Sequence, residues 1–140
     1  MSTLAEVEKR RADRREAADK AREAQEVTDL EAIEALEAGG AMLHTMTAPR
    51  HVPGVVMKIG FRAPTAGEYK RYLDTIGAAS QRQDHKGRTA ALTTLAASCL
   101  VYPAADERAA LLAEFPGTLV SLALEAAKIA ELRAEEEGKG

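Results

Sequence analysis

Cysteine and aromatic residues are scarce in this sequence of 140 residues. Cys99 is the only cysteine, which excludes a disulfide within the chain and a zinc site built from several cysteines. Three Tyr, two Phe and no Trp make up 4% of the residues. So few rings argue against a base-stacking platform for single-stranded nucleic acid. They also predict a core built from aliphatic side chains.

Long hydrophobic runs and a strong charge of one sign are also lacking. The first residues contain no apolar segment typical of a secretory signal, and the longest near-apolar stretch, 94–102, is too short to span a bilayer. Nineteen basic and 22 acidic residues give a net charge of −3, which argues against attraction of the whole chain to phosphate. We therefore expect a soluble, cytoplasmic protein with no membrane partner.

Residues that can carry chemistry are present, but they form no recognised pattern. His44, His51 and His85 lack the spacing and the companion ligands of a metal site, and we expect them at the surface. Cys99 lies on the apolar stripe of a predicted helix, where a buried and unreactive thiol is expected. No glycine-rich phosphate loop is found. We therefore predict that the chain is not an enzyme and holds neither a metal nor a cofactor.

Charge is distributed in three blocks. Residues 1–40 have a net charge of −4, residues 41–105 of +5, and residues 106–140 of −4. Because both flanks are acidic, the middle block is better suited to an acidic protein surface than to nucleic acid, and a simple solvated face is the alternative. The cations predicted to form this partner-binding basic band are Lys58, Arg62, Lys70, Arg71, Arg82, Lys86 and Arg88.

Residues 1–40 are predicted to form a long, charged helical arm. Ser2 or Thr3 can cap its N-terminus, and Gly39-Gly40 supplies a stop signal. Between Val7 and Val27 there is no large aliphatic residue, so this part cannot bury a face of its own. No heptad is sustained, so we expect a solvated arm rather than a coiled-coil dimer. The residues predicted to dock the arm on the body are Val27, Leu30, Ile33 and Leu36.

Residues 55–62 are predicted to form a strand, because apolar side chains occupy every second position. A turn at Pro53-Gly54 precedes it. Residues 42–47 can form a second short strand beside it. Everything after residue 62 has the pattern of helices, so we expect the strand to have at most one partner within the chain. The alternating apolar residues are Val55, Met57, Ile59 and Phe61.

The rest of the body, which we expect to extend over residues 41–133, is predicted to contain four helices. Thr65 and Glu68 form a capping box at the start of the first. The polar stretch 77–87 is predicted to be a loop, or a loop that follows a frayed helix end. The second helix follows it, with an apolar stripe that includes Leu95 at helical spacing.

The second of these helices is predicted to end before Pro103, because the residue that precedes a proline is disfavoured in the α conformation. A short helix then ends at Pro116-Gly117, and the last helix starts near Thr118. Residues 134–140 are predicted to be an acidic, flexible tail. The predicted fold class is therefore mainly α: a small helical domain with a short β strand or ribbon and a long N-terminal helical arm.

Three short motifs in the second half of the chain carry a family resemblance. Residues 61–72 read Phe-Arg-Ala-Pro-Thr-Ala-Gly-Glu-Tyr-Lys-Arg-Tyr, residues 99–103 read Cys-Leu-Val-Tyr-Pro, and residues 111–117 read Leu-Leu-Ala-Glu-Phe-Pro-Gly before an apolar closing helix. With these motifs, residues 55–132 resemble the small tail assembly chaperones of long-tailed bacteriophages and prophages. The arm takes no part in the resemblance.

The resemblance implies a role without catalysis in the cytoplasm of a host bacterium. Proteins of this family bind the tape measure protein, a long and aggregation-prone helical rod, and keep it soluble while tail-tube subunits polymerise around it. The tape measure protein, and with it the tail-tube protein, are the implied partners, and a homo-oligomer is compatible with this role. Two alternatives stay open: a structural accessory protein of the virion, at the head–tail junction or baseplate, and a nucleic-acid-binding regulator.

Overall fold

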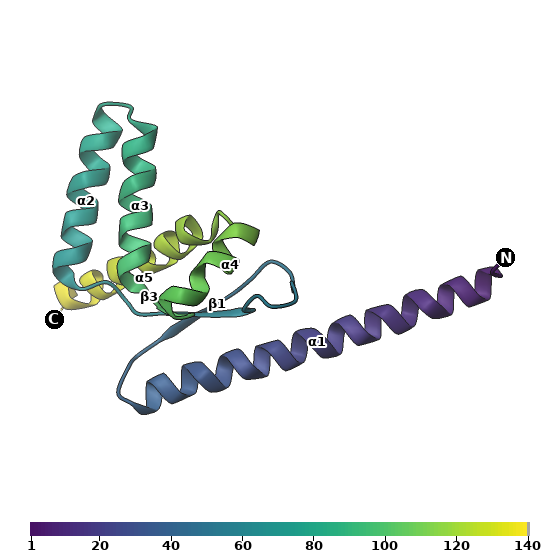
Figure 1. The fold of residues 1–140 in the computed structure, drawn as a ribbon. Coiled ribbons are helices and arrows are strands. Elements are labelled where there is room, and N and C mark those ends of the chain that lie inside the picture. Colours follow the sequence, from purple (N-terminus) through teal and green to yellow (C-terminus); the bar gives the residue numbers. More distant parts are fainter. Residues whose placement is uncertain (140) are drawn as a thin grey trace.

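A computed structural model describes residues 1–139, and within them the fold is mainly helical, with five α-helices and one small antiparallel sheet (Figure 1). The predicted fold class is confirmed. In chain order the elements are α1 (Leu4–Ala38), β1 (His44–Thr47), β2 (Lys58–Phe61), α2 (Ala66–Gln81), α3 (His85–Cys99), β3 (Leu100–Tyr102), the 3₁₀ turn η1 (Ala105–Glu107), α4 (Arg108–Glu114) and α5 (Thr118–Lys139).

The sheet has the order β1-β2-β3, so that β2 pairs on both sides. The predicted second strand is confirmed, and Thr47 pairs with Lys58 at its end. The expectation of at most one partner was wrong, since Phe61 also pairs with Leu100 of β3. Strand β3 was not predicted because its three residues directly continue the apolar pattern of α3.

The two faces of β2 have different environments. The predicted alternation is confirmed, because the apolar side chains at every second position are at most 7% exposed and belong to the core. That core is completed by α3 and by α5, which packs against α3. The opposite face carries Gly60, where an added Cβ would come within 3.2 Å of the Ile33 side chain. Glycine at this position therefore lets α1 approach the sheet closely.

Asp29 fixes α1 on the sheet. Its Oδ2 accepts hydrogen bonds from the backbone N–H groups of Met57 (2.6 Å) and Lys58 (2.9 Å), and its Oδ1 accepts from the Tyr102 hydroxyl (2.7 Å) and the Gln25 amide (2.9 Å). The Asp29 side chain is fully buried. Burial, together with the hydrogen bond to Asp29, raises the pKa of the Tyr102 phenol. One polar residue thus connects α1 to two strands.

The docking residues predicted for the arm were mostly wrong. Ile33 is 2% exposed, as a docked residue should be, but Val27, Leu30 and Leu36 are 54%, 39% and 40% exposed. Ile33 lies one helical turn after Asp29 and therefore on the same face, whereas Val27 and Leu30 lie on other sides of α1. Leu36 shares the face of Asp29 but lies in the last turn of α1, where it stays exposed. The arm is docked through a polar residue and one isoleucine rather than through an apolar stripe.

The loop predicted for residues 77–87 is much shorter in the structure. Helix α2 continues to Gln81, and α3 already begins at His85, because the Asp84 side chain accepts a hydrogen bond from the Gly87 N–H (2.9 Å) and caps the helix. The polar composition reflects the solvated tip of a helical hairpin, where both helix ends face water. The α2–α3 hairpin therefore projects from the body (Figure 1).

The C-terminal segment also differs from the prediction. Residues 134–139, which we expected to be a flexible tail, continue helix α5, and Gly140 lies outside the described residues. The short helix before it is found as α4, and α5 begins at Thr118 as predicted. The glutamates near the end of α5 are exposed, so a polar helix end has the same composition as a tail.

Candidate functional site

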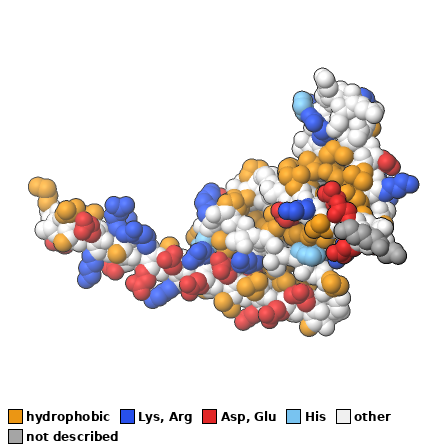
Figure 2. Space-filling model, turned by 180° about the vertical axis from the view of Figure 1, so that it is seen from behind, with side chains coloured by type: hydrophobic (Ala, Val, Ile, Leu, Met, Phe, Trp, Pro, Cys, Tyr) orange, Lys and Arg blue, Asp and Glu red, His pale blue; other side chains and the backbone are white. Residues whose placement is uncertain are grey.

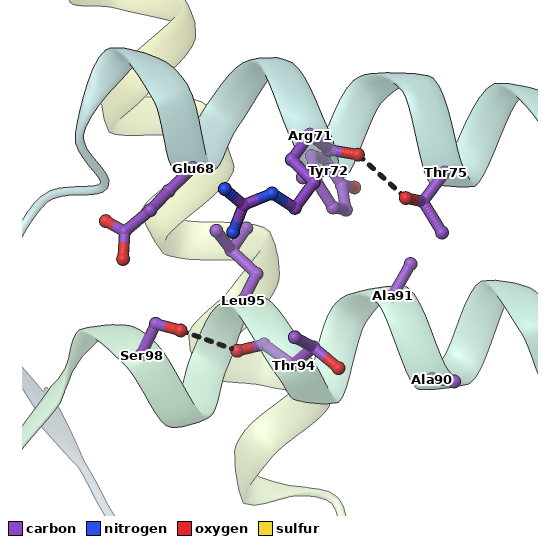
Figure 3. A pocket seen from close by; sticks show the side chains of 9 residues that line it. All are labelled: Glu68, Arg71, Tyr72, Thr75, Ala90, Ala91, Thr94, Leu95 and Ser98. Carbon is purple, nitrogen blue, oxygen red and sulfur yellow. Dashed lines mark hydrogen bonds between the residues drawn. The ribbon is translucent and has the colours of Figure 1, made fainter.

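A groove between α2 and α3 is the best-formed candidate for a binding site (Figure 3). Its volume is about 240 Å³. Along α3 it extends from Ala90 to Ser98, which is about two helical turns, or roughly 12 Å. The groove is therefore long enough to contact two turns of a partner helix. It is lined by Glu68, Arg71, Tyr72, Thr75, Ala90, Ala91, Thr94, Leu95 and Ser98.

The lining of the groove is mainly apolar in character, although several residues are polar. The Thr75 hydroxyl donates to the Arg71 carbonyl oxygen (2.8 Å), and the Ser98 hydroxyl donates to the Thr94 carbonyl oxygen (3.1 Å). These hydroxyl protons are therefore used within their own helices. Tyr72 is half-buried, and burial raises the pKa of its phenol. With these donors engaged, contacts in the groove depend on shape and apolar surface.

Charge is confined to one end of the groove. Glu68 is bound by the guanidinium group of Arg62 through two hydrogen bonds, of 2.7 and 2.8 Å. Arg71 extends over the groove from α2 (Figure 3). Among the lining residues, Arg71 has a charge that forms no ion pair within residues 1–139. The groove therefore presents a free cation at one edge.

Arg62 and Glu68 hold the base of the hairpin together. Arg62 also donates to the Ser98 carbonyl oxygen (2.7 Å) in the last turn of α3, where helix carbonyls lack partners of their own. Glu68 accepts from the Thr65 N–H, and Thr65 in turn accepts from the Glu68 N–H, which confirms the predicted capping box. This network fixes the start of α2 against the end of α3 and so sets the width of the groove.

We expect Glu68→Gln to destabilise the protein by about 1–3 kcal/mol near neutral pH, because a hydrogen-bonded ion pair is lost. The Arg62 guanidinium lowers the pKa of Glu68 from 4.5 to about 2. A lowered pKa in the folded state gives stability that is present above the unfolded pKa and lost as pH falls toward the folded pKa. The difference between wild type and variant should therefore shrink between about pH 4.5 and pH 2, which urea unfolding across this range measures.

The exposed Glu125 on α5, which forms no ion pair within the described residues, provides the control for this prediction. Glu125→Gln should leave the free energy of unfolding near its wild-type value at every pH. A constant difference between wild type and Glu68→Gln down to about pH 2 would contradict the assignment of the stabilising ion pair.

The predicted basic band does not form one surface. Arg62 is engaged within the fold, and the Lys58 ammonium donates to the Thr47 hydroxyl (2.8 Å) on the sheet. Lys70 and Arg71 are exposed on α2, and only Arg71 borders the groove. The other three lie around the tip of the hairpin, where Arg88 contacts His85; they are Arg82, Lys86 and Arg88. Their role in partner binding stays a prediction.

Sequence reasoning did not identify the groove itself. It placed the apolar stripe of α3 in the core, and Leu95 and Cys99 are indeed buried. No function was predicted for the small residues on the neighbouring side of α3, although Ala90, Thr94 and Ser98 follow one another at intervals of four. A row of small residues beside an apolar stripe is the signal that could have indicated a hollow along this helix.

Hydrophobic side chains also gather over the base of the hairpin on the rear of the molecule (Figure 2). The large apolar residues of α2 and α5 that remain exposed are Leu73 at 46%, Leu124 at 56% and Leu132 at 52%. A further hollow of about 400 Å³ lies between β1 and the turn before α5, where the Arg50 guanidinium covers the Phe115 ring at 5.0 Å. Phe115, which lines this second hollow, is thus already covered on one side of its ring by Arg50, whereas the α2–α3 groove is flanked by two long helices.

The remaining chemistry-bearing residues lie apart from the groove. Cys99 is fully buried, and burial raises the pKa of its thiol to about 11, so the thiol stays protonated near neutral pH. His44 lies against Phe61 in the sheet, with ring centroids 5.6 Å apart. Within the described part of the chain, no three His, Cys, Asp or Glu side chains are grouped to hold a metal ion.

Of the helices in residues 1–139, none alone has the length and apolar composition of a membrane span. The segments η1–α4 and α5 have that length and composition only when they are taken together, and the chain bends by 109° between them.

Comparisons with protein-family models, with curated proteins and with solved structures found no match for this chain.

Proposed function

We propose that this chain is a non-enzymatic assembly chaperone of phage tails, which binds an apolar helical segment of the tape measure protein in the cytoplasm of the host bacterium. The resemblance of residues 55–132 to this class of chaperone supports the proposal. The observation that carries it is the apolar groove between α2 and α3, because its length suits two turns of a helix.

The contacts of the groove define the segment it would bind. Ala90 and Thr94 are small and exposed, so that a partner backbone can approach α3 closely. Apolar side chains at i, i+3, i+4 and i+7 of the partner would fill the space above Tyr72 and Leu95. Arg71 favours an acidic residue or the C-terminal end of the bound helix at its edge. The bound segment is therefore an amphipathic helix that places an acidic residue or its C-terminal end beside Arg71.

Co-expression with a tape measure protein, whose gene the proposal places beside the gene for this chain, tests the proposal. We expect the soluble fraction of that protein to rise several-fold when this chain is present, and a complex of the two to survive size-exclusion chromatography. Equal insolubility with and without this chain, together with no complex, would overturn the proposal.

A pair of variants assigns the effect to the groove. Ala90→Trp introduces a large side chain from an exposed position of the groove wall, so it should fill the groove without disturbing the core. We expect it to abolish the gain in partner solubility. Ala109→Trp changes an equally exposed alanine on α4 that does not line the groove, and it should retain full activity. Loss of activity in both variants, or in neither, would place the binding surface elsewhere.

The two rival roles predict different results in other assays. A structural accessory protein would be detected in purified virions, whereas an assembly chaperone is absent from them. A nucleic-acid-binding regulator would bind duplex DNA at physiological ionic strength, with an affinity that falls steeply as salt is raised.

A further inference from the structure

The first two thirds of α1 are unpartnered. Every residue from Met1 to Ala24 is exposed, and this part of the helix projects away from the body (Figure 1). With 35 residues, α1 is roughly 52 Å long, so the free part extends well beyond the sheet that holds its other end. An isolated helix with so little apolar surface is marginal in water, which points to a partner along the free part.

The charges of α1 are segregated along its length. Residues 9–15 contain five basic residues and one acidic residue, whereas residues 16–38 contain eight acidic and two basic residues. Figure 2 shows blue and red side chains together toward the free end and mainly red ones where the helix passes the body. The last turn contains no cation, although the helix dipole favours cations there. The acidic second part of the helix, unlike Glu6 in the first turn, is therefore placed unfavourably for the helix dipole.

Two faces of α1 combine this charge with exposed apolar side chains. The basic face is formed by Leu4, Val7, Arg11 and Arg15, which follow one another at intervals of three and four. Leu4 is 75% exposed and Val7 is 36% exposed. On this face, neither arginine forms an ion pair within residues 1–139.

The acidic face is formed by Glu23, Val27, Leu30 and Glu34, again at intervals of three and four. It lies on the side of α1 opposite the buried Asp29, so docking on the sheet leaves it open to solvent. Within the described chain, neither glutamate forms an ion pair. The two faces are therefore alike in size and apolar content and opposite in charge.

We propose that α1 joins copies of this chain to one another, with the basic face of one copy bound to the acidic face of the next. Leu4, Val7 and Arg11 have the same spacing as Val27, Leu30 and Glu34, so a parallel, staggered register would pair Arg11 with Glu34. The apolar residues of the two faces would be buried between the helices. The proposal is independent of the groove and of its occupant.

The placement of the faces determines the kind of assembly. The basic face continues the side of α1 that carries Asp29, whereas the acidic face lies on the other side. A straight helix cannot offer both sides to one partner, so each copy binds one neighbour through each face. Such head-to-tail contacts produce a chain or a closed ring rather than a symmetric dimer.

Analytical ultracentrifugation of the full-length protein tests this assembly. At low salt the mass should rise with concentration beyond that of two copies, and it should fall as salt screens the charges. Arg11→Glu with Arg15→Glu removes the basic face, and Glu23→Lys with Glu34→Lys removes the acidic face. Each double variant alone should be a monomer, because both of its faces then carry the same charge. An equimolar mixture should assemble beyond two copies again, because each face of one variant is complementary in charge to the facing surface of the other.

The control reverses two exposed glutamates away from α1, Glu125→Lys with Glu131→Lys on α5, and it should assemble like wild type. Circular dichroism verifies that all variants keep their helix content. A wild-type monomer at every concentration, or assembly that survives both double reversals, would overturn the proposal. A wild-type species that stops at two copies would overturn the head-to-tail arrangement.

Discussion

Asp29→Ala should lower the free energy of unfolding by about 3–5 kcal/mol and release α1 from the sheet. Three donors outside α1 lose their acceptor in this variant: the N–H groups of Met57 and Lys58 and the Tyr102 hydroxyl. Because the Asp29 side chain is fully buried, water cannot replace it without opening the contact between helix and sheet. Urea unfolding measures the loss of stability, and hydrogen exchange of α1 and β2 locates it.

Two matched changes separate the role of Asp29 from that of the rest of the arm. Tyr102→Phe removes one of the hydrogen bonds and should cost about 1 kcal/mol. Deletion of residues 1–24 removes only exposed helix and should leave the midpoint of unfolding nearly unchanged. If this deletion destabilises the protein as much as Asp29→Ala does, the free part of the arm must pack against the body.

Leu122→Ala should cost about 3 kcal/mol, since it leaves a cavity in the middle of the core. Leu122 is fully buried on the side of α5 that belongs to the core. Leu124, two residues later in the same helix, is 56% exposed, and Leu124→Ala should change the free energy of unfolding by less than about 0.5 kcal/mol. The two variants have the same change in helix propensity, so the difference between their unfolding curves measures burial alone.

Equal costs for Leu122→Ala and Leu124→Ala would contradict the placement of α5. A helix rotated by half a turn would bury Leu124 instead, and a loosely packed core would make both changes mild. The packing of α3 against α5 places the small residues Ala123 and Ala126 beside Leu122 in this core. Ala123 and Ala126 are too small to fill the space that the leucine side chain would leave.

The parts of the fold that follow from local patterns were predicted from the sequence. Alternating side chains identified β2 and its buried face, and the capping box identified the start of α2. The limits of the α2–α3 hairpin were not predicted, because a solvated hairpin tip and a loop share the same polar composition. β3 was missed because three residues are too short for a periodic pattern, and their pairing with β2 depends on the return of the chain after the hairpin.

The candidate site could not be predicted from the sequence for a related reason. The groove depends on how two helices are spaced, and that spacing is set by the ion pair between Arg62 and Glu68. Both residues were visible in the sequence, but Arg62 was assigned to a partner-binding band. Asp29 was not singled out because it is one of eleven acidic residues within residues 1–40. On a helix that is expected to be exposed to water, the sequence does not distinguish one of them from the others. The partners of Asp29 lie 28, 29 and 73 residues later in the chain.

The hydrogen bonds of Asp29 also have a consequence for the order of folding. β1 and β2 are neighbours in the chain, so their pairing closes a short loop at little entropic cost. β3 follows the α2–α3 hairpin, so the sheet is complete only after both helices have been made and folded. Tyr102, which completes the set of donors around Asp29, arrives with β3. During synthesis from the N-terminus, α1 therefore leaves the ribosome first and is the element whose docking is completed late.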